Sequence, residues 1–469
     1  MRSLPVAAIS WLLAAQAAAV PSPLNGRSAG YGLSLNATST RVRGACPARS
    51  PTASATIPGD TSAPSVPIGA PNPSSSAFIG NPDDGPVSSL YYSNTGALEP
   101  QDLPLDNINR IMYAFGVVAS DGTVSAGNVE KDLTEKAGTN LPTSGNNVYG
   151  RVRQLNLVKR ANRHVKVLLS LGGWGNNGPI SAAASSETGR HQFATSVVKL
   201  VTDWGFDGID LDWEYVTTQA ERDNVILLLK ATREAFDTYS AQNAGGYRFL
   251  ITYASPAGAQ NYEALNIQGM DPYVDTWNLM TYDFAGGWSQ VTAFQSNLYP
   301  SLTYPKATVT STDTIVKYYL SQGIAPSKLH VGLPLYGHAF DNTTGLGESF
   351  NGTGPGEDNQ GGNWSYKDLP RPGAKENNDF DAVAAWSYDP VRKEIITYDN
   401  VGSAYTKALY ILSENLGGAF FWEANDDKPG NGSLVDTVAR SFLQLSTSQN
   451  LLSYPTSKYD NIRSGSPTS

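Results

Sequence analysis

Between residues 88 and 422, short apolar runs alternate with amphipathic segments, and this alternation limits the folds open to the chain. Eight runs have the length and the β-branched or aromatic content of strands: 88–92, 110–116, 165–172, 206–214, 247–254, 276–282, 329–335 and 418–422. The segments 193–204 and 225–236 place apolar residues three or four positions apart, as in a helix with one buried face. Eight such repeats predict an α/β fold, a (β/α)8 TIM barrel. A doubly wound sheet is the alternative, because alternation alone does not separate the two.

One connection is longer than the others. After the seventh run, residues 337–400 contain glycine-rich turns followed by alternating runs near 386–389 and 394–398. Structureless loops of this length are uncommon in compact domains. We therefore expect a small α+β insertion after strand 7 that forms one wall of a cleft at the strand C-termini. The catalytic barrel is then expected over 87–336 and 401–447, with 448–469 as a C-terminal tail.

The first 86 residues predict export rather than a folded module. Residues 1–19 start with a basic Arg2, continue with an apolar stretch and end in small alanines, which is typical of a secretory signal peptide. Residues 20–86 are rich in Ser, Pro, Ala, Thr and Gly and are expected to be a disordered propeptide or linker. With one cysteine, Cys46, an intramolecular disulfide is impossible. Candidate glycosylation sequons start at Asn36, Asn342, Asn351, Asn363 and Asn431. We expect a secreted, extracellular monomer.

Charge and composition exclude several classes of partner. The formal net charge is -9 and no basic stripe is present, which argues against nucleic acid because phosphate binding needs clustered Lys and Arg. No segment after the leader is long and apolar enough to cross a bilayer, so no membrane partner is expected. The four histidines lack the spacing of metal ligands, and we expect neither a metal nor a cofactor. A neutral substrate fits this composition.

The run 206–214 contains three acids two residues apart, Asp210, Asp212 and Glu214. In a strand these positions face one side, and the apolar residues between them face the other. An ordinary half-exposed strand with acids toward water is the alternative. Inside a barrel, however, three crowded carboxyl groups cannot all ionise, so at least one keeps a proton near neutral pH. A protonated carboxyl group is what a general acid requires.

Four segments in order resemble the motifs of glycoside hydrolase family 18, the chitinase family. Residues 207–214 resemble its signature, and 169–174, 278–283 and 417–423 resemble its third-, sixth- and eighth-strand motifs. Residues 449–461 resemble the tail of secreted chitinases from filamentous fungi. The resemblance covers about 87–463. It implies hydrolysis of the β-1,4 links between N-acetylglucosamine units, with chitin or chitooligosaccharides as the partner.

The resemblance also implies roles for single residues. In this family the acetamido oxygen of the substrate is the nucleophile, an exception to the two-carboxylate scheme. Glu214 matches the general acid, Asp212 the residue that bonds the acetamido N–H, and Asp210 its proton-sharing neighbour. Tyr282 matches the phenol that bonds the acetamido oxygen. The other predicted binding residues are Trp422, Asp283, Met280, Tyr215, Trp174, Gly173, Tyr113 and Phe115. Asp207 lies on the opposite face of its strand from the three acids and is expected to be structural.

The sequence departs from the family around the cleft. The loop 92–100 is short and lacks a tryptophan, glycine and asparagines follow Trp174 where a second tryptophan is usual, and His338 stands where the family often has Arg. These changes predict a weaker grip on long or crystalline chitin, with preserved chemistry on short chains. Two alternatives stay open: a chitin-binding lectin on the same barrel, and an endo-β-N-acetylglucosaminidase that acts on N-glycans.

Overall fold

The computed structural model describes residues 85–136, 141, 144–357 and 361–463. The predicted signal peptide at 1–19, residues 20–84 of the predicted linker, the sequon at Asn36 and the last six residues of the tail lie outside the described part.

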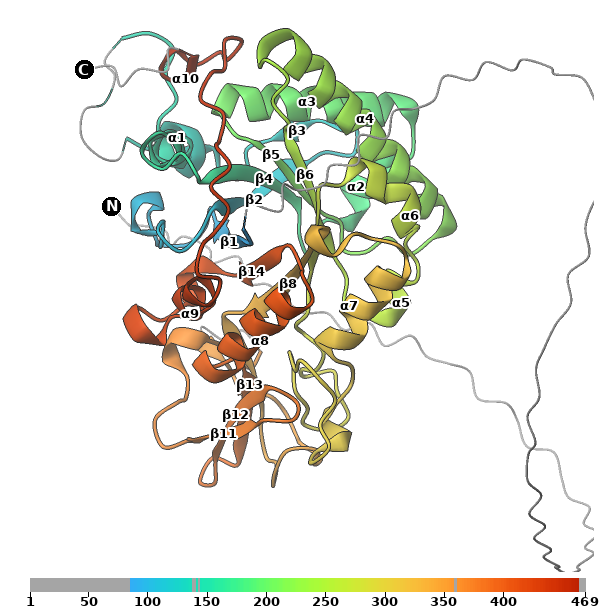
Figure 1. Cartoon of the computed structure of the whole chain (residues 1–469), viewed down its shortest axis with the longest axis vertical. Coiled ribbons are helices and arrows are strands. Elements are labelled where there is room, and N and C mark those ends of the chain that lie inside the picture. Colours follow the sequence, from blue (N-terminus) through green and yellow to red (C-terminus); the bar gives the residue numbers. More distant parts are fainter. Residues whose placement is uncertain (1–84, 137–140, 142–143, 358–360, 464–469) are drawn as a thin grey trace, which may run out of the picture. The chain divides into compact units, whose positions relative to one another are not determined.

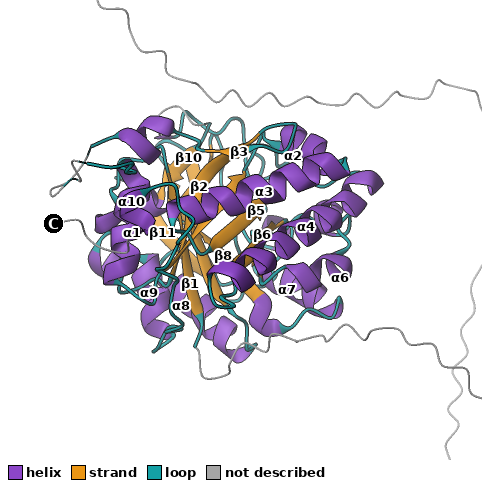
Figure 2. Ribbon diagram, turned by 90° about the horizontal axis from the view of Figure 1, so that it is seen from above, coloured by secondary structure: helices purple, strands orange, loops and turns teal. Residues whose placement is uncertain are grey.

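Eight parallel strands form the barrel, with helices around them (Figure 1, Figure 2). They are β1 (Val87–Ser93), β2 (Arg110–Val118), β4 (Lys166–Gly172), β5 (Gly208–Asp212), β6 (Leu250–Ser255), β7 (Thr276–Leu279), β8 (Leu329–Pro334) and β14 (Gly418–Trp422). Their order is β1-β14-β8-β7-β6-β5-β4-β2, and pairing of β1 with β2 closes the ring. A short strand, β3 (Val124–Ser125), pairs with β2. The predicted TIM barrel is confirmed and the doubly wound alternative is wrong.

Helices fill most of the connections between barrel strands. They are α1 (Gly150–Ala161), α2 (Asn177–Ala184), α3 (Glu187–Trp204), α4 (Gln219–Asn243), α5 (Ala259–Tyr262), α6 (Ile267–Met270), α7 (Thr312–Ser321), α8 (Val401–Ser413), α9 (Leu434–Ser441) and α10 (Asp460–Arg463). The predicted apolar faces fall within α3 and α4, where Phe193, Val197, Leu228 and Phe236 are buried in the main core. None of the helices in the described part is both long and apolar enough to span a bilayer.

An antiparallel sheet follows the seventh barrel strand. Its strands are β9 (Tyr336–Phe340), β10 (Asn363–Ser365), β11 (Lys375–Asp379), β12 (Ala384–Asp389) and β13 (Glu394–Tyr398), in the order β10-β9-β13-β12-β11. In Figure 1 it is the orange sheet below β8 and β14. Phe294, Phe340, Trp386 and Ile395 belong to its separate small core. The predicted insertion is confirmed, although helical structure in its described residues is limited to short 3-10 turns.

The C-terminal tail is anchored to the N-terminal end of the barrel through Asp207. Its carboxylate accepts hydrogen bonds from the amide of Leu451 in the tail (2.9 Å) and from the hydroxyl of Tyr247 (3.0 Å). It also forms a fully buried ion pair with Lys159 at 2.8 Å. Tyr454 of the tail bonds the same lysine at 2.9 Å. These contacts show that Asp207 has a structural role: it ties the tail to the barrel. It lies at the opposite end of β5 from the other acids.

Three of the four described sequon asparagines, Asn342, Asn351 and Asn431, are exposed, whereas Asn363 is half-buried in β10. The exposed asparagines are therefore the better acceptor candidates, and glycosylation of any of them stays a prediction.

Candidate active site

The three acids come together at the C-terminal end of the barrel. Asp210 and Asp212 lie in β5 and are buried, and Glu214 follows the strand in a half-buried position. On the other face of this segment, Ile209, Leu211 and Trp213 are fully buried in the main core. The strand alternation expected from the sequence therefore places all three carboxyl groups on the inner side.

Asp210 is the most fully hydrogen-bonded of the three acids. Its Oδ2 accepts from the hydroxyls of Tyr91 and Ser170, each at 2.8 Å. Its Oδ1 accepts from the Thr252 hydroxyl at 2.6 Å and from Asn278 Nδ2 at 3.1 Å. These donors come from four different strands. Four donors thus hold both oxygens of this carboxyl group in place.

Asp212 and Glu214 have the opposite environment. Burial raises the pKa of Asp212 well above its ordinary value, and the charges of Glu214 and Asp210 add to this effect. The Oδ1 of Asp212 has no hydrogen-bond partner among the described residues. Burial also raises the pKa of Glu214 to about 7, while a hydrogen bond from Tyr215 acts in the opposite direction. Both shifts keep protons on the trio near neutral pH.

An aromatic cluster surrounds the acids. Its members are Tyr91, Met112, Ala114, Ala254, Met280, Tyr282 and Phe420, with Phe115, Tyr215, Tyr336 and Trp422 packed against it. The Trp422 ring lies 5.0 Å from Tyr91 and is stacked on Phe115 at 5.7 Å, both between centroids. Burial raises the pKa of Tyr282 well above its usual range, so its hydroxyl stays protonated and can donate. The cluster joins Met280, Tyr282, Phe115, Tyr215 and Trp422, all predicted site residues.

The insertion contributes to the same site through Asp283. This residue follows β7, adopts a left-handed φ of 57°, and has a half-exposed side chain. Its Oδ1 accepts from the Tyr336 hydroxyl at 2.6 Å and lies 2.7 Å from His338 Nε2. Both partners belong to β9. The exposed Trp288 packs on the His338 ring at 5.3 Å. Sequence reasoning did not assign Tyr336, whose one signal was its position directly after the seventh strand.

Gly173 and Trp174 lie at the end of β4. Gly173 has a φ of +80°, and a Cβ there would lie 2.8 Å from the Phe115 ring. The missing side chain thus makes room for the ring on which Trp422 stacks. Trp174 is 63% exposed, with its ring 6.2 Å from that of Tyr215, so the indole face is available to a ligand.

The prediction that Tyr113 binds substrate is wrong. Its side chain is buried in the main core, packs on Phe206 and donates its hydroxyl proton to Asp132. Phe115, two residues later, belongs instead to the cluster at the acids. The pairing of β2 with β4 shifts register between Tyr113 and Gly116. This irregularity interrupts the regular alternation of β2 between the two residues, so Tyr113 and Phe115 have different environments.

Sequence reasoning also missed Tyr91, Thr252 and Asn278 as partners of Asp210. All three lie in predicted strands, and each faces the barrel interior. A second buried acid, Glu423, follows Trp422 directly, and burial raises its pKa to about 7. It accepts from Asn425 Nδ2 at 3.0 Å and from the Ser93 amide at 3.2 Å. Glu423 thereby joins the ends of β14 and β1.

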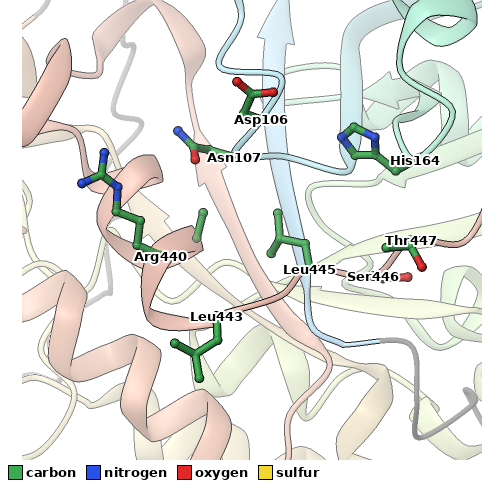
Figure 3. Close-up of a pocket in the computed structure, with 9 residues that line it drawn as sticks. Asp106, Asn107, His164, Arg440, Leu443, Leu445, Ser446 and Thr447 are labelled. Carbon is green, nitrogen blue, oxygen red and sulfur yellow. The ribbon is translucent and has the colours of Figure 1, made fainter.

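Two other features do not belong to the site. Figure 3 shows a hollow lined by Asn107, His164, Arg440 and Leu445, among others. Asn107 and His164 precede β2 and β4, so the hollow lies at the N-terminal end of the barrel, away from the acids. Across the described residues, no group of three or more His, Cys, Asp or Glu side chains is arranged to hold a metal ion.

Known proteins resemble this chain over most of its length. The family model described as "Glycosyl hydrolases family 18" matches residues 88–427. Chitinase 1 of Aphanocladium album is 41% identical over 397 residues, 84% of this chain and 94% of that protein. Endochitinase 1 of Metarhizium robertsii is 40% identical over 403 residues, 85% of this chain and 94% of that protein. The solved catalytic domain of psychrophilic chitinase B from Arthrobacter TAD20 has a TM-score of 0.70 at 26% identity, covering 78% of this chain and 98% of that one.

Proposed function

The chain belongs to glycosyl hydrolase family 18, and on this premise we propose that it is a chitinase that cuts β-1,4 links between N-acetylglucosamine units with retention of configuration. One observation carries the proposal: Glu214, with a pKa raised to about 7, stands beside two buried acids in a ring of aromatic side chains. This arrangement supplies a proton donor at neutral pH and a surface suited to the apolar faces of sugars.

In the first step, Glu214 donates its proton to the bridging oxygen. The bond between that oxygen and the anomeric carbon breaks, and the leaving chain departs with a hydroxyl group. The acetamido oxygen of the same sugar forms a bond to the anomeric carbon, which gives an oxazolinium ion and a Glu214 carboxylate. An attached nucleophile gains from proximity, so no second protein carboxylate needs to attack.

In the second step, the Glu214 carboxylate takes a proton from water, and the water oxygen bonds to the anomeric carbon. The oxazolinium ring opens and the acetamido group is restored. Asp212, whose Oδ1 has no partner among the described residues, bonds the acetamido N–H and stabilises the positive intermediate. Asp210 and Asp212 share one proton through these steps. Tyr282 donates to the acetamido oxygen and holds it at the reacting carbon.

The aromatic residues bind the sugar rings. Trp422, packed on Phe115 and Tyr91, forms a rigid face below the distorted sugar. Met280 and Tyr215 belong to the same cluster, Asp283 accepts a hydrogen bond from its member Tyr336, and Gly173 keeps space for the Phe115 ring. The exposed Trp174 offers a further face for a neighbouring sugar.

Two relatives named as a chitinase and an endochitinase, each about 40% identical over most of this chain, favour endo-acting chitin hydrolysis over cleavage of N-glycans. The intact trio favours hydrolysis over lectin-like binding. Product analysis by mass spectrometry, with chitooligosaccharides and a high-mannose glycoprotein as substrates, separates these functions. We expect short chitooligosaccharide products from wild type and a loss of about a thousandfold or more in Glu214→Gln. Cleavage of the glycoprotein alone, or of neither substrate, would overturn the proposal.

We also propose that the enzyme is exported and acts as a monomer; the leader pattern at residues 2–20 supports export. Amino-terminal sequencing of protein from the culture medium tests this, with a start after residue 19 expected. Size-exclusion chromatography with light scattering tests the monomer.

A further inference from the structure

A buried arginine lies inside the barrel below the acids. Arg110, the first residue of β2, is 6% exposed. One terminal nitrogen donates to the Thr276 hydroxyl at 3.3 Å, and its Nε has no partner. Among the described residues, no carboxylate oxygen lies within ion-pair distance of this guanidinium. A cation buried without direct pairing is costly, which calls for a compensating role.

The Arg110 side chain reaches across the barrel. In the closed ring, β2 and β7 are four strands apart in either direction, so they lie on opposite sides. The bond from Arg110 to Thr276 therefore crosses the interior. Two residues further along each strand, Asn278 Nδ2 lies 3.4 Å from Met112 Sδ and also donates to Asp210. Because two strand residues rise about 6.6 Å, the Thr276 hydroxyl that accepts from Arg110 stands roughly one such step below the level at which Asn278 donates to Asp210.

Of the two acids that interact with Arg110, Asp210 is the one without an ion pair among the described residues. The charged and titratable groups that interact electrostatically with Arg110 are Asp275 before β7, Asp210 on β5, Tyr247 before β6 and His330 on β8. Asp275 is already paired with arginines outside the barrel, at 2.5 Å and 2.9 Å. Tyr247 donates to Asp207. Burial and the charge of Arg110 lower the pKa of His330 well below its usual value, so that ring is neutral.

We propose that Arg110 is a positioning residue whose charge keeps the Asp210–Asp212 pair at one shared proton. The inference rests on the proposed function, because the pair needs a single proton during turnover. Uptake of a second proton at low pH leaves Asp212 unable to stabilise the positive intermediate. The charge of Arg110 opposes this second protonation without touching the substrate.

The test is the pH dependence of kcat/KM on a chitooligosaccharide. Arg110→Met removes the charge and keeps much of the volume. If the two charges are separated by about this 6.6 Å step, with an effective dielectric constant of about 20 to 40, the acidic limb of the pH profile should move to higher pH by about 1 to 2 units. Arg110→Lys keeps the charge, and Thr276→Val removes only the hydrogen bond. Both variants should keep the acidic limb of wild type.

A matched control is Arg151→Met. Arg151 is also a buried arginine, but it donates to the main-chain oxygens of Gly96 and of Ser93, the last residue of β1, and lies 3.9 Å from Glu99. Its loss should lower stability and leave the acidic limb in place. Circular dichroism shows which variants fold. If Arg110→Met does not fold, Arg110→Lys still tests the proposal, because it keeps the positive charge. An acidic limb in Arg110→Lys that moves by roughly the 1 to 2 pH units expected for loss of the charge would overturn the proposal.

A readout without turnover separates this inference from the proposed function. Fluorescence of the tryptophans beside the site, measured against pH in the ligand-free protein, follows protonation of the trio. A fluorescence midpoint that lies at higher pH in Arg110→Met than in wild type supports the inference. It does so even if wild type cuts no chitooligosaccharide, although that lack of activity would refute the chitinase assignment. If wild type is active, and Arg110→Met has the same acidic limb and the same fluorescence midpoint as wild type, the inference is refuted and the chitinase assignment stands.

Discussion

The contact between Gly173 and Phe115 offers a direct test of how the aromatic face is built. A Cβ at position 173 would meet three ring carbons of Phe115 at 2.8, 2.9 and 3.1 Å, well inside contact distance. Phe115 supports Trp422, so a displaced ring at 115 also displaces the indole at 422. We therefore expect Gly173→Ala to lower both stability and kcat/KM.

The magnitude has two parts. Gly173 has a φ of +80°, and the left-handed conformation costs a residue with a Cβ about 1 to 2 kcal/mol. Crowding against a packed ring adds about 1 to 3 kcal/mol. The free energy of unfolding should therefore fall by about 2 to 5 kcal/mol in total.

The chain provides a matched control at Gly175. It has a φ of +89°, but a Cβ there would meet nothing within 4 Å. Gly175→Ala should thus cost only the backbone part, about 1 to 2 kcal/mol, and leave kcat/KM close to wild type. The difference between the two variants isolates the clash with the ring.

Denaturant unfolding measures stability, and initial rates on a chitooligosaccharide measure kcat/KM. In the double variant Gly173→Ala/Phe115→Leu, the smaller side chain should recover part of the crowding cost but not the activity, because Trp422 loses its support. Equal stability losses in Gly173→Ala and Gly175→Ala would refute the reasoning, as would full activity of Gly173→Ala.

Three further predictions concern protonation and burial. Because Glu214 must be protonated to act and its pKa is raised to about 7 by burial and by the charge of Asp283, kcat/KM should fall as pH rises through about 7. In Asp283→Asn that basic limb should move to lower pH; an unmoved or rising limb would count against the assignment. Folding raises the pKa of Glu214 from 4.5 to about 7, so the folded state holds this proton more tightly and wild type loses stability as pH rises through that window. Thermal unfolding of Glu214→Gln should therefore lack this part of the decline, and parallel curves for both proteins would contradict it. Lys159→Met leaves Asp207 buried without its ion pair and should cost about 3 to 5 kcal/mol in denaturant unfolding, whereas a loss below about 1 kcal/mol would show that the pair contributes little.

The strand that bears the acids was predictable because its signal is local. Alternation in 206–214 determines which side chains share a face. The apolar Ile209 and Leu211 pack in the main core on one face, so the acids occupy the other face, toward the barrel interior. The eight repeats determine the barrel for a similar reason, because each strand and helix is one continuous segment whose pattern is visible locally in the sequence. Even the insertion was visible as a connection too long to be a loop.

The partners of Asp210 were not predictable in the same way. Its four donors come from β1, β4, β6 and β7, and which residues stand level with one another depends on strand register and barrel tilt. Tyr113 shows the same limit within a single strand. Its register irregularity toward Gly116 depends on pairing with β4 and leaves no mark in the sequence of β2 alone.

The insertion is linked to the acids through Asp283. Its strand β9 is held on both sides, by β10 and by β13, and this pairing fixes where Tyr336 and His338 stand. Both contact one oxygen of Asp283, and the charge of Asp283 raises the pKa of Glu214. The position of a sheet outside the barrel is thereby coupled to the acidity of a side chain inside it. Substitutions in β9 should accordingly change the pH dependence of the reaction without touching any of the three acids.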